Sequence, residues 1–179
     1  MIKALVRNYQ PSGSRLRAAD CQLSSKGTPP RPFRYLWPLM IPPFPDLETR
    51  IRRKLAGQHF MHLLGADLTA IAPGRVVAAL VLGQAHQQQR GFVHGGVTAT
   101  LADLVAGFAA VTLVPDNFGV VTADLRISYL HPGVGQKLRA IGWVLKPGRR
   151  LHFCEAEVWC DELLIAKASA TMAVVEPAA

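Results

Sequence analysis

The spacing of apolar residues predicts a short amphipathic helix at the start of the patterned part of the chain. Residues 45–57 (PDLETRIRRKLAG) have Asp46 in the position of an N-cap, an acidic first turn, basic residues late in the segment and Gly57 at the end. Apolar residues recur every fourth position on one side of this segment: Leu47, Ile51 and Leu55. We therefore expect one face of this helix to pack on the rest of the protein.

A change of period after this helix predicts two strands and then a long helix. LTAIA (68–72) and RVVAALVL (75–82) flank a Pro-Gly pair, a pattern typical of a strand, a tight turn and a second strand. A polar loop over 84–93 follows. Over 95–114 every residue is apolar, small or hydroxylated except Asp103, so we predict a helix without a polar face.

Four strands are predicted after the long helix. The first alternates strictly, which places two sets of residues on opposite faces: Val121, Ala123, Leu125, Ile127 and Tyr129 on one, and Thr122, Asp124, Arg126 and Ser128 on the other. The other three cover roughly 135–146, 150–160 and 162–175, separated by short turns. In the strand over 150–160 four residues share a face: Cys154, Ala156, Val158 and Cys160.

The order of these elements predicts the fold class. A helix that is apolar all round either spans a membrane or is enclosed by other structure. A carboxylate at mid-membrane costs about 2.5 to 3.5 kcal/mol, so Asp103 argues against a membrane span. Short turns join antiparallel strands and cannot make parallel crossovers. We therefore predict an α+β fold in which a curled antiparallel sheet of about six strands wraps around one long central helix.

The charge distribution separates a basic leader from one nearly neutral domain. The net charge is +8, but residues 1–39 hold seven Lys or Arg against one Asp (+6), and the remainder holds 13 against 11 (+2). The leader is rich in Pro and Ser and lacks a signal-peptide core, so we expect it to be poorly ordered. It is a dispensable extension or a tether to a membrane surface or nucleic acid. Residues 40–179 form the predicted single domain, for which we expect no nucleic-acid partner.

Cysteine and histidine spacing gives no sign of a disulfide framework or a metal site. Cys21, Cys154 and Cys160 are an odd number and include no C-x-x-C pair, which favours a reducing cytoplasm. His59 and His62 have a spacing that suits a metal, but no cluster of acidic or cysteine ligands accompanies them. The chain also lacks the nucleophile elbow of serine hydrolases, the phosphate-binding loop and the dinucleotide fingerprint.

Asp103 is the residue that most needs an explanation. A carboxylate inside an apolar environment is costly unless a partner stabilises it, so it is either paired or retained for a chemical task. The structural alternative is a salt bridge to an arginine of a neighbouring strand, for which Arg126 and Arg139 are the candidates.

Three segments of the chain resemble a known family. They are GFVHGGVTATLADLVAGFAA, VTADLRISYLHPG and KPGRRLHFCEAEVWCDELLIAKASATMAVV. Together they resemble the hotdog-fold acyl-CoA thioesterases of the phenylacetate-pathway and 4-hydroxybenzoyl-CoA type, over about residues 46–175. The most specific feature is H-G-G followed, seven residues after its last glycine, by an acid on the same helix. The resemblance implies hydrolysis of an acyl-CoA thioester to a carboxylate and coenzyme A, with no metal or redox cofactor.

The resemblance also implies roles for residues of the long helix. Asp103 matches the acid that attacks the thioester carbonyl or activates the attacking water, and the choice between nucleophile and general base stays open. Unpaired N–H groups at a helix start can stabilise an oxyanion, which suits Gly95 and Gly96. The alternative is that both glycines only make a tight turn. Gly107 stands where relatives that have Glu as the acid often have Ser or Thr, and it makes room for the acyl group or a partner helix.

Further site residues are implied in the loop before the helix and in a turn near the C-terminus. Gln88, with Gln89 as its rival, matches an amide that orients water or the thioester. His94 matches a histidine that positions the leaving thiolate or the loop, and a helix-capping role is its alternative. Lys146, Arg149 and Arg150 make up a basic turn that is either solvated or meets the phosphates of coenzyme A.

Helix geometry favours a site shared between two chains. Asp103 lies eight residues beyond Gly95, about 12 Å along a helix axis. An attacking acid and an oxyanion donor that serve one carbonyl group must lie within about 6 Å of each other. We therefore expect a dimer with shared active sites, and the family pattern implies a dimer of dimers. The acyl group, the choice between coenzyme A and acyl carrier protein, and an acyl-CoA sensor without turnover all stay open.

Overall fold

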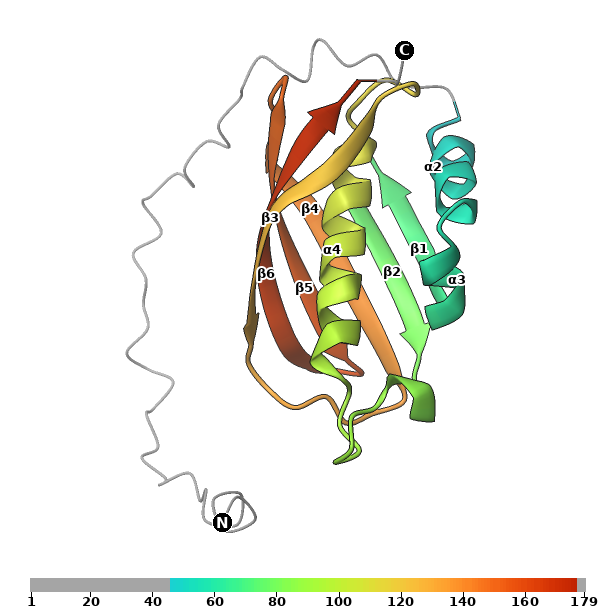
Figure 1. Cartoon of the computed structure of the whole chain (residues 1–179), viewed down its shortest axis with the longest axis vertical. Helices are drawn as coiled ribbons and strands as arrows, with labels where there is room; N and C mark the ends of the chain where they lie inside the picture. Colours follow the sequence, from blue (N-terminus) through green and yellow to red (C-terminus); the bar gives the residue numbers. More distant parts are fainter. Residues whose placement is uncertain (1–45, 177–179) are drawn as a thin grey trace, which may run out of the picture. The chain divides into compact units, whose positions relative to one another are not determined.

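The computed structural model describes residues 46–176 and confirms the predicted order of two helical regions and six strands (Figure 1). Two short elements were not predicted, the helix α3 and the 3-10 turn η2. The elements in chain order are α2 (Leu47–Ala56), α3 (His59–Leu64), β1 (Ala66–Ala72), β2 (Arg75–Val81), η2 (Gln84–His86), α4 (Gly95–Val111), β3 (Gly119–Tyr129), β4 (Lys137–Lys146), β5 (Leu151–Cys160) and β6 (Leu163–Val175).

The six strands form one antiparallel sheet in the order β1-β2-β4-β5-β6-β3. Figure 1 shows α4 lying along one face of this sheet, with α2 and α3 beside β1. The predicted fold class, a curled sheet around a long central helix with a short N-terminal helix, is confirmed. The strands β1 and β3 are the two edges of the sheet, and β3 is 11 residues long.

The core lies between α4 and the inner face of the sheet. Leu101 and Val105 of α4 are fully buried, and Leu138 and Val158 of the sheet are buried with them. A β-carbon at Gly142 would collide with the backbone of α4, so a glycine is needed where β4 meets the helix. The predicted apolar face of β5 is buried as expected: Cys154, Ala156, Val158 and Cys160.

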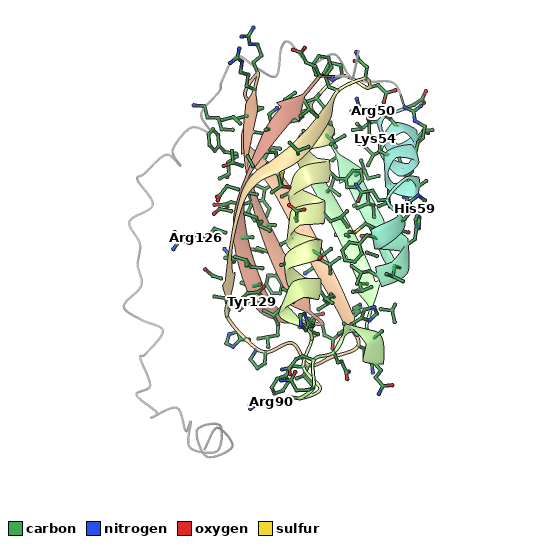
Figure 2. The ribbon with its side chains drawn as sticks, viewed as in Figure 1. Arg50, Lys54, His59, Arg90, Arg126 and Tyr129 are labelled. Carbon is green, nitrogen blue, oxygen red and sulfur yellow. The ribbon has the colours of Figure 1, made fainter. Side chains whose placement is uncertain are left out.

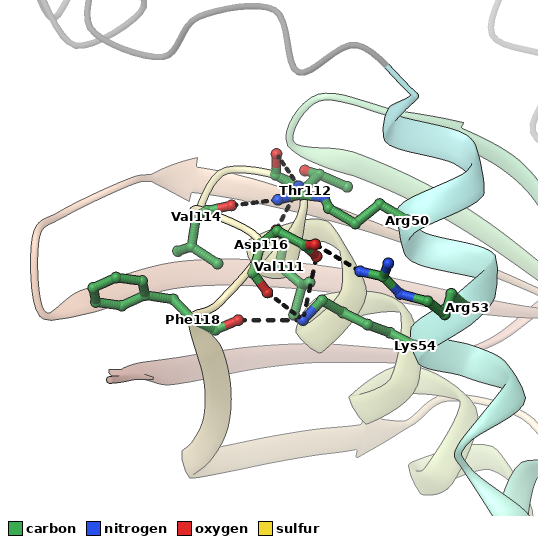
Figure 3. A network of polar contacts seen from close by, with 8 residues as sticks. All are labelled: Arg50, Arg53, Lys54, Val111, Thr112, Val114, Asp116 and Phe118. Atoms are coloured by element: carbon green, nitrogen blue, oxygen red, sulfur yellow. Dashed lines mark hydrogen bonds and ion pairs between the residues drawn. The ribbon is translucent and has the colours of Figure 1, made fainter. Parts of the chain in front are cut away.

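An arginine of α2 caps the C-terminus of α4 (Figure 3). Arg50 is 7% exposed, and its guanidinium donates to the carbonyl oxygens of Val114 (2.7 Å), Val111 (3.2 Å) and Thr112 (3.3 Å). The last carbonyl groups of a helix have no partner within the helix and carry partial negative charge, which a cation stabilises. Burial lowers the pKa of Arg50 from its ordinary value. This contact joins α2 to the central helix.

Two further cations of α2 bind the loop after α4. Arg53 donates to Asp116 at 2.6 Å, and this hydrogen bond lowers the pKa of the Asp116 carboxyl. Lys54 donates to the carbonyl oxygens of Asp116 (2.9 Å) and Phe118 (3.4 Å), as Figure 3 shows. The predicted basic end of α2 therefore has a role that its sequence position did not indicate, which is to hold the loop that leads into β3.

Asp46 is the N-cap residue of α2 as predicted, but its side chain does not cap the helix. Asp46 precedes α2 as expected, but its φ of 67° is left-handed and its side chain makes no capping hydrogen bond. The backbone carbonyl of Asp46 accepts from the N–H of Arg50 at 3.0 Å. The apolar face of α2 is packed as predicted, since Ile51 and Leu55 are buried.

The strict alternation predicted for β3 is wrong in its first half because of a β-bulge. Thr122 pairs with Met172 and Asp124 with Thr171, so Ala123 is the extra residue. An extra residue reverses the faces of the residues before it, because side chains alternate with a period of two. Val121 is accordingly 52% exposed rather than inward. Leu125 and Ile127, after the bulge, pack against the core as predicted.

The remaining expectations from the sequence concern the leader, the cysteines and a membrane span. The leader over residues 1–39, with Cys21, lies outside the described residues. Cys154 and Cys160 are free thiols, and burial raises the pKa of Cys154 to about 12. None of the helices in residues 46–176 has the length and apolar character needed to cross a bilayer.

Candidate active site

Asp103 lies on the one side of α4 that the rest of the chain leaves accessible. Eleven of the 17 residues of α4 are buried, but the helix is not enclosed all round as predicted. A line of partly accessible residues runs along it at helical spacing: Gly96, Ala99, Thr100, Asp103 and Gly107. The carboxylate is thus only half-buried, which explains how an apolar helix tolerates it.

The hydroxyl of Thr122 holds the Asp103 carboxylate. Thr122 Oγ1 donates to Asp103 Oδ1 at 2.7 Å and lies 3.5 Å from the sulfur of Met172. The bulge at Ala123 makes this contact possible, because it turns Thr122 toward α4. Sequence analysis placed Thr122 on the other face from the apolar residues and missed it as a site residue. The residue types of the strand do not show that it contains a one-residue bulge.

The predicted structural alternative for Asp103, a salt bridge to an arginine, is not found. Asp103 forms no ion pair within residues 46–176. Arg126 lines a hollow with outward-facing residues of the sheet, and Arg139 stacks over the ring of Trp159 at 5.6 Å. The carboxylate is therefore not explained as part of a structural ion pair.

A pocket of about 260 Å³ lies beside Asp103. Its polar side includes Asp103 and Thr122, and its apolar side is formed by residues of α3, α4 and β3: Met61, Leu104, Phe108 and Val120. Gly107 lines the same pocket, and a β-carbon there would meet no atom within 4 Å. The pocket therefore has the character expected of a site that places an apolar group beside a carboxylate.

The imidazole of His94 caps the N-terminus of α4. His94 Nδ1 accepts from the N–H of Gly96 at 2.9 Å, so the capping alternative describes its contact in this structure. Because Nδ1 is the acceptor, the neutral ring carries its proton on Nε2 and can donate outward. The N–H of Gly96 is thereby used, whereas the N–H of Gly95 has no acceptor among the described residues. Gly95 is the open donor at this helix end.

Tyr129 fixes the position of Gly95. Its hydroxyl donates to the Gly95 carbonyl oxygen at 2.9 Å, and a β-carbon on Gly95 would lie 3.4 Å from its ring. The sequence pattern predicted Tyr129 only as a strand residue and did not indicate this contact. The glycine lets the end of β3 approach the first turn of α4 closely.

Gln88 lies in the same hollow as Gly95, and Gln89 does not. The hollow measures about 330 Å³ and is lined by Gln88, Gly95 and Tyr129 among others. Gln88 is half-buried, and its Oε1 accepts from the N–H of Arg90 at 3.0 Å, which leaves its NH₂ group to donate elsewhere. Gln89 is exposed. The structure thus brings Gln88 and Gly95 together.

The acid and the helix start are not brought together within one chain. The hollow at Gly95 and the pocket at Asp103 share no lining residue. In Figure 2, Lys54, which lines the pocket of Asp103, and Tyr129, which lines the hollow of Gly95, lie toward opposite ends of α4. The separation agrees with the distance expected from helix geometry.

The basic turn between β4 and β5 is also remote from Gly95 within the chain. Arg149 and Arg150 are exposed, and the Arg150 carbonyl accepts from the N–H of Val174 at the end of β6. That end of β6 pairs with the start of β3, which follows the C-terminus of α4. Lys146, at the end of β4, and both arginines therefore lie at the opposite end of α4 from Gly95.

His59 and His62 both lie on α3, and His62 Nε2 lies 3.1 Å from the carbonyl oxygen of Ala56. Within residues 46–176 no group of three or more His, Cys, Asp or Glu side chains is placed to hold a metal ion.

The candidate site offers two chemical groups. They are the carboxylate of Asp103 beside an apolar pocket and the free N–H of Gly95 at the start of α4. Those are the parts of a hydrolase that attacks a carbonyl group.

Comparisons with known proteins agree with this class. Residues 90–166 match the thioesterase superfamily. Human acyl-coenzyme A thioesterase 13 is 30% identical over 115 residues, which are 63% of this chain and 81% of the human protein. The crystal structure of a thioesterase family protein from Silicibacter pomeroyi has a TM-score of 0.71 at 30% identity, over 73% of this chain and 98% of that one.

The PaaI protein of the Escherichia coli phenylacetic acid degradation operon shares the fold. Its structure has a TM-score of 0.68 at 17% identity and covers 73% of this chain and 94% of that chain. Together, the matched segment and the relatives at 30% identity show that the chain belongs to the thioesterase superfamily. It is a thioester hydrolase with the hotdog fold that its sequence led us to expect.

Proposed function

We propose that this protein hydrolyses acyl-CoA thioesters to a carboxylate and coenzyme A, with Asp103 as the attacking acid. The observation that carries this proposal is the half-buried Asp103 carboxylate, held by Thr122 beside an apolar pocket. Human acyl-coenzyme A thioesterase 13 supports the substrate class, since its name gives acyl-coenzyme A as the substrate. Water is the only co-reactant and no oxidation state changes, so the proposed reaction uses no redox cofactor, and the proposal gives a metal ion no role.

Asp103 acts in one of two ways. As a nucleophile, its carboxylate oxygen bonds to the thioester carbon and expels the coenzyme A thiolate, and water then hydrolyses the resulting anhydride. As a general base, it takes a proton from water that attacks the same carbon. In both cases the carbonyl oxygen gains negative charge, which the free N–H of Gly95 stabilises together with the amide of Gln88. In this proposal His94 Nε2 donates to the leaving sulfur.

The apolar side of the pocket at Asp103 is where the acyl group binds in this proposal. A volume of about 260 Å³ suits an aryl or medium-length acyl group better than a long chain in full contact. Gly107 widens this pocket, because its missing side chain leaves open space. This arrangement gives Gly107 the substrate-binding role that the sequence suggested.

The proposed site is completed by a second chain. The accessible line of small residues on α4, with Asp103 in its middle, offers a surface on which a partner helix can lie. The edge strand β3 offers 11 residues of backbone for pairing with the same strand of the partner. Antiparallel α4 helices would then bring Asp103 of one chain toward the H-G-G turn of the other.

The same antiparallel arrangement gives the basic turn a role. The turn with Lys146, Arg149 and Arg150 lies at the C-terminal end of α4 of its own chain. In the dimer it would lie at the same end as the partner's H-G-G turn, where the coenzyme A thioester is held. Its cations would then contact the phosphates of coenzyme A. Free thiols at Cys154 and Cys160 suit a reducing cytoplasm.

A panel of acyl-CoA esters, assayed by release of free thiol, tests the proposed activity. We expect turnover of phenylacetyl-CoA, benzoyl-CoA or a medium-chain ester with kcat in the ordinary enzyme range of about 1 to 10³ s⁻¹. Acyl-phosphopantetheine on carrier protein serves as the comparison for the coenzyme. Tight binding of acyl-CoA by calorimetry without thiol release would instead favour the alternative function, an acyl-CoA sensor that does not turn its ligand over.

Replacing Thr122 by Val should lower kcat about 10-fold with little change in KM. Valine keeps the shape of the side chain and removes the only hydroxyl that donates to Asp103 among the described residues, at a cost of about 1.4 kcal/mol in the transition state. Thr122→Ser is the matched control and should restore kcat. A Thr122→Val protein with the kcat of the wild type would mean that the hydroxyl has only a packing role.

A further inference from the structure

Met172 closes the pocket of Asp103 on the side of the sheet, next to the attacking carboxylate. Its side chain is fully buried and lines this pocket. The sulfur of Met172 lies 3.5 Å from Thr122 Oγ1, and the same hydroxyl donates to Asp103 Oδ1 at 2.7 Å. The thioether sulfur is therefore no more than about 6 Å from an oxygen of the carboxylate that acts on the thioester.

The pairing of the strands explains why a residue of β6 lies so close to the reacting groups. Thr122 of β3 pairs with Met172 of β6, which in turn pairs with His152 of β5. Met172 and His152 are buried on the inner face of the sheet, and the bulge in β3 turns Thr122 toward α4. Side chains that lie directly opposite each other on paired strands have β-carbons about 5 Å apart. Met172 is thus the neighbour of Thr122 in this row.

The fully buried side chains that pack with Met172 are small. They come from α4, β5 and β6: Ala106, Ala110, Cys154 and Ala170. The other buried walls of the pocket belong to the main core, which has many large side chains: Met61, Leu104, Phe108 and Val111. Alanine and cysteine side chains have no length with which to fill a space beside them, so a shortened Met172 would leave that space open to the pocket.

We propose that Met172 determines how much bulk the protein accepts in the acyl group next to the thioester carbon. This inference rests on the proposed function, because it takes Asp103 as the attacking acid and its pocket as the acyl site. Reacting atoms lie about 3 Å apart in a productive complex, so the first carbons of the acyl group lie beside Thr122 and Met172. A straight chain passes the thioether, whereas a branch at the carbon next to the carbonyl collides with it.

The surroundings of Met172 make it an effective barrier. A methionine side chain is flexible and fills irregular gaps, but this one is enclosed on all sides and its sulfur contacts the Thr122 hydroxyl. Moving it aside for a branched acyl group would disturb the hydroxyl that holds Asp103. One methylene more or less in an apolar pocket changes kcat/KM by about 10- to 200-fold. The effect of this one side chain is therefore measurable.

Three acyl-CoA esters with the same number of acyl carbons separate bulk near the carbonyl from bulk far from it. Hexanoyl-CoA is unbranched, 2-ethylbutanoyl-CoA branches next to the carbonyl, and 4-methylpentanoyl-CoA branches near the far end of the chain. Met172→Ala should raise the kcat/KM ratio of 2-ethylbutanoyl-CoA to hexanoyl-CoA at least about 10-fold. The ratio of 4-methylpentanoyl-CoA to hexanoyl-CoA should not change. Comparison of ratios between variants cancels the lower intrinsic reactivity of a branched ester.

Three further variants control for volume, position and folding. Met172→Leu keeps the volume of the side chain and should keep the wild-type ratios. Met61→Ala removes the same atoms from the α3 wall of the pocket and should not favour 2-ethylbutanoyl-CoA over 4-methylpentanoyl-CoA. Met172→Val covers the case in which Met172→Ala does not fold, since a β-branched residue suits a strand. It shortens the side chain and should shift the ratio in the same direction.

The binding of thioether analogues tests the inference without turnover. S-hexyl-CoA and S-(2-ethylbutyl)-CoA have a methylene group in place of the carbonyl and cannot be hydrolysed, and calorimetry gives their Kd values. We expect Met172→Ala to favour the branched analogue by the same factor as in kcat/KM. Wild-type protein that releases no thiol from any ester would refute the proposed activity, and this shift in Kd would still support the role of Met172. Unchanged ratios in folded Met172→Ala or Met172→Val protein, or an equal shift in Met61→Ala, would overturn the inference.

Discussion

Asp103→Asn should lower kcat for acyl-CoA hydrolysis by at least about 10³-fold and leave the melting temperature within about 2 °C of the wild type. The amide keeps the shape of the carboxylate and keeps an oxygen to accept from Thr122, so the hydrogen bond at 2.7 Å can persist. It removes the charge that attacks the thioester or takes a proton from water. Thiol release from the best substrate of the panel measures the loss.

Asp124→Asn is the matched control for this variant. Asp124 is an exposed carboxylate on the same strand as Thr122, beyond the bulge, so its replacement removes the same charge without touching the pocket. We expect wild-type turnover from it. Asp103→Asn with most of the wild-type rate would show that the acid has a structural role, and an unfolded Asp103→Asn protein would point to an essential contact of the carboxylate.

Two inactive variants should complement each other if the site is shared. We expect a heterodimer of an Asp103→Asn chain and a His94→Ala/Gly95→Pro chain to recover about half of the wild-type activity, since one of its two composite sites is intact. Proline is tolerated at the first position of a helix and lacks the N–H group, so the second chain loses the donor at Gly95 with little damage to α4. The separate hollows of Asp103 and Gly95 motivate this test.

Co-expression of the two variants with different affinity tags yields the heterodimer. The blank for each variant is a dimer in which both differently tagged chains carry that same variant. Activity should rise above both blanks only in the doubly tagged fraction. A purified heterodimer that is no more active than the blanks would mean that the acid and the helix start serve one chain's own site. Thiol release by the wild-type protein would be unaffected by that result, so the enzyme class would stand.

Local periodicity was enough to predict most of the secondary structure. Burial of one face explains the four-residue spacing in α2, the apolar run of α4 and the alternation in β5. Such a face can be recognised from residues that are close together in the sequence. The short α3 and η2 were missed, since six and three residues are too few to show a period. The motif H-G-G with an acid on the same helix pointed to Asp103, Gly95 and His94.

Contacts between distant parts of the chain were beyond such patterns. Arg50 reaches the end of α4 across more than 60 residues of sequence, and its own helix gives no sign of that partner. The imidazole of His94 accepts a hydrogen bond from the N–H of Gly96. This contact depends on the orientation of the ring in the folded loop, which the sequence does not show. The sequence could not distinguish Gln88 from Gln89 as the site residue. The folded loop places Gln88, and not Gln89, in the hollow of Gly95.

The sequence by itself determined the element order, the enclosure of most of α4 and the acid at Asp103, because each follows from which residues avoid water and at what spacing. The tertiary structure alone decided the support of that acid. The single extra residue at Ala123 reverses the faces of the first half of β3 and turns Thr122 toward Asp103. A bulge changes neither composition nor hydrophobic content, and its position depends on pairing with β6, which follows some 40 residues later in the chain.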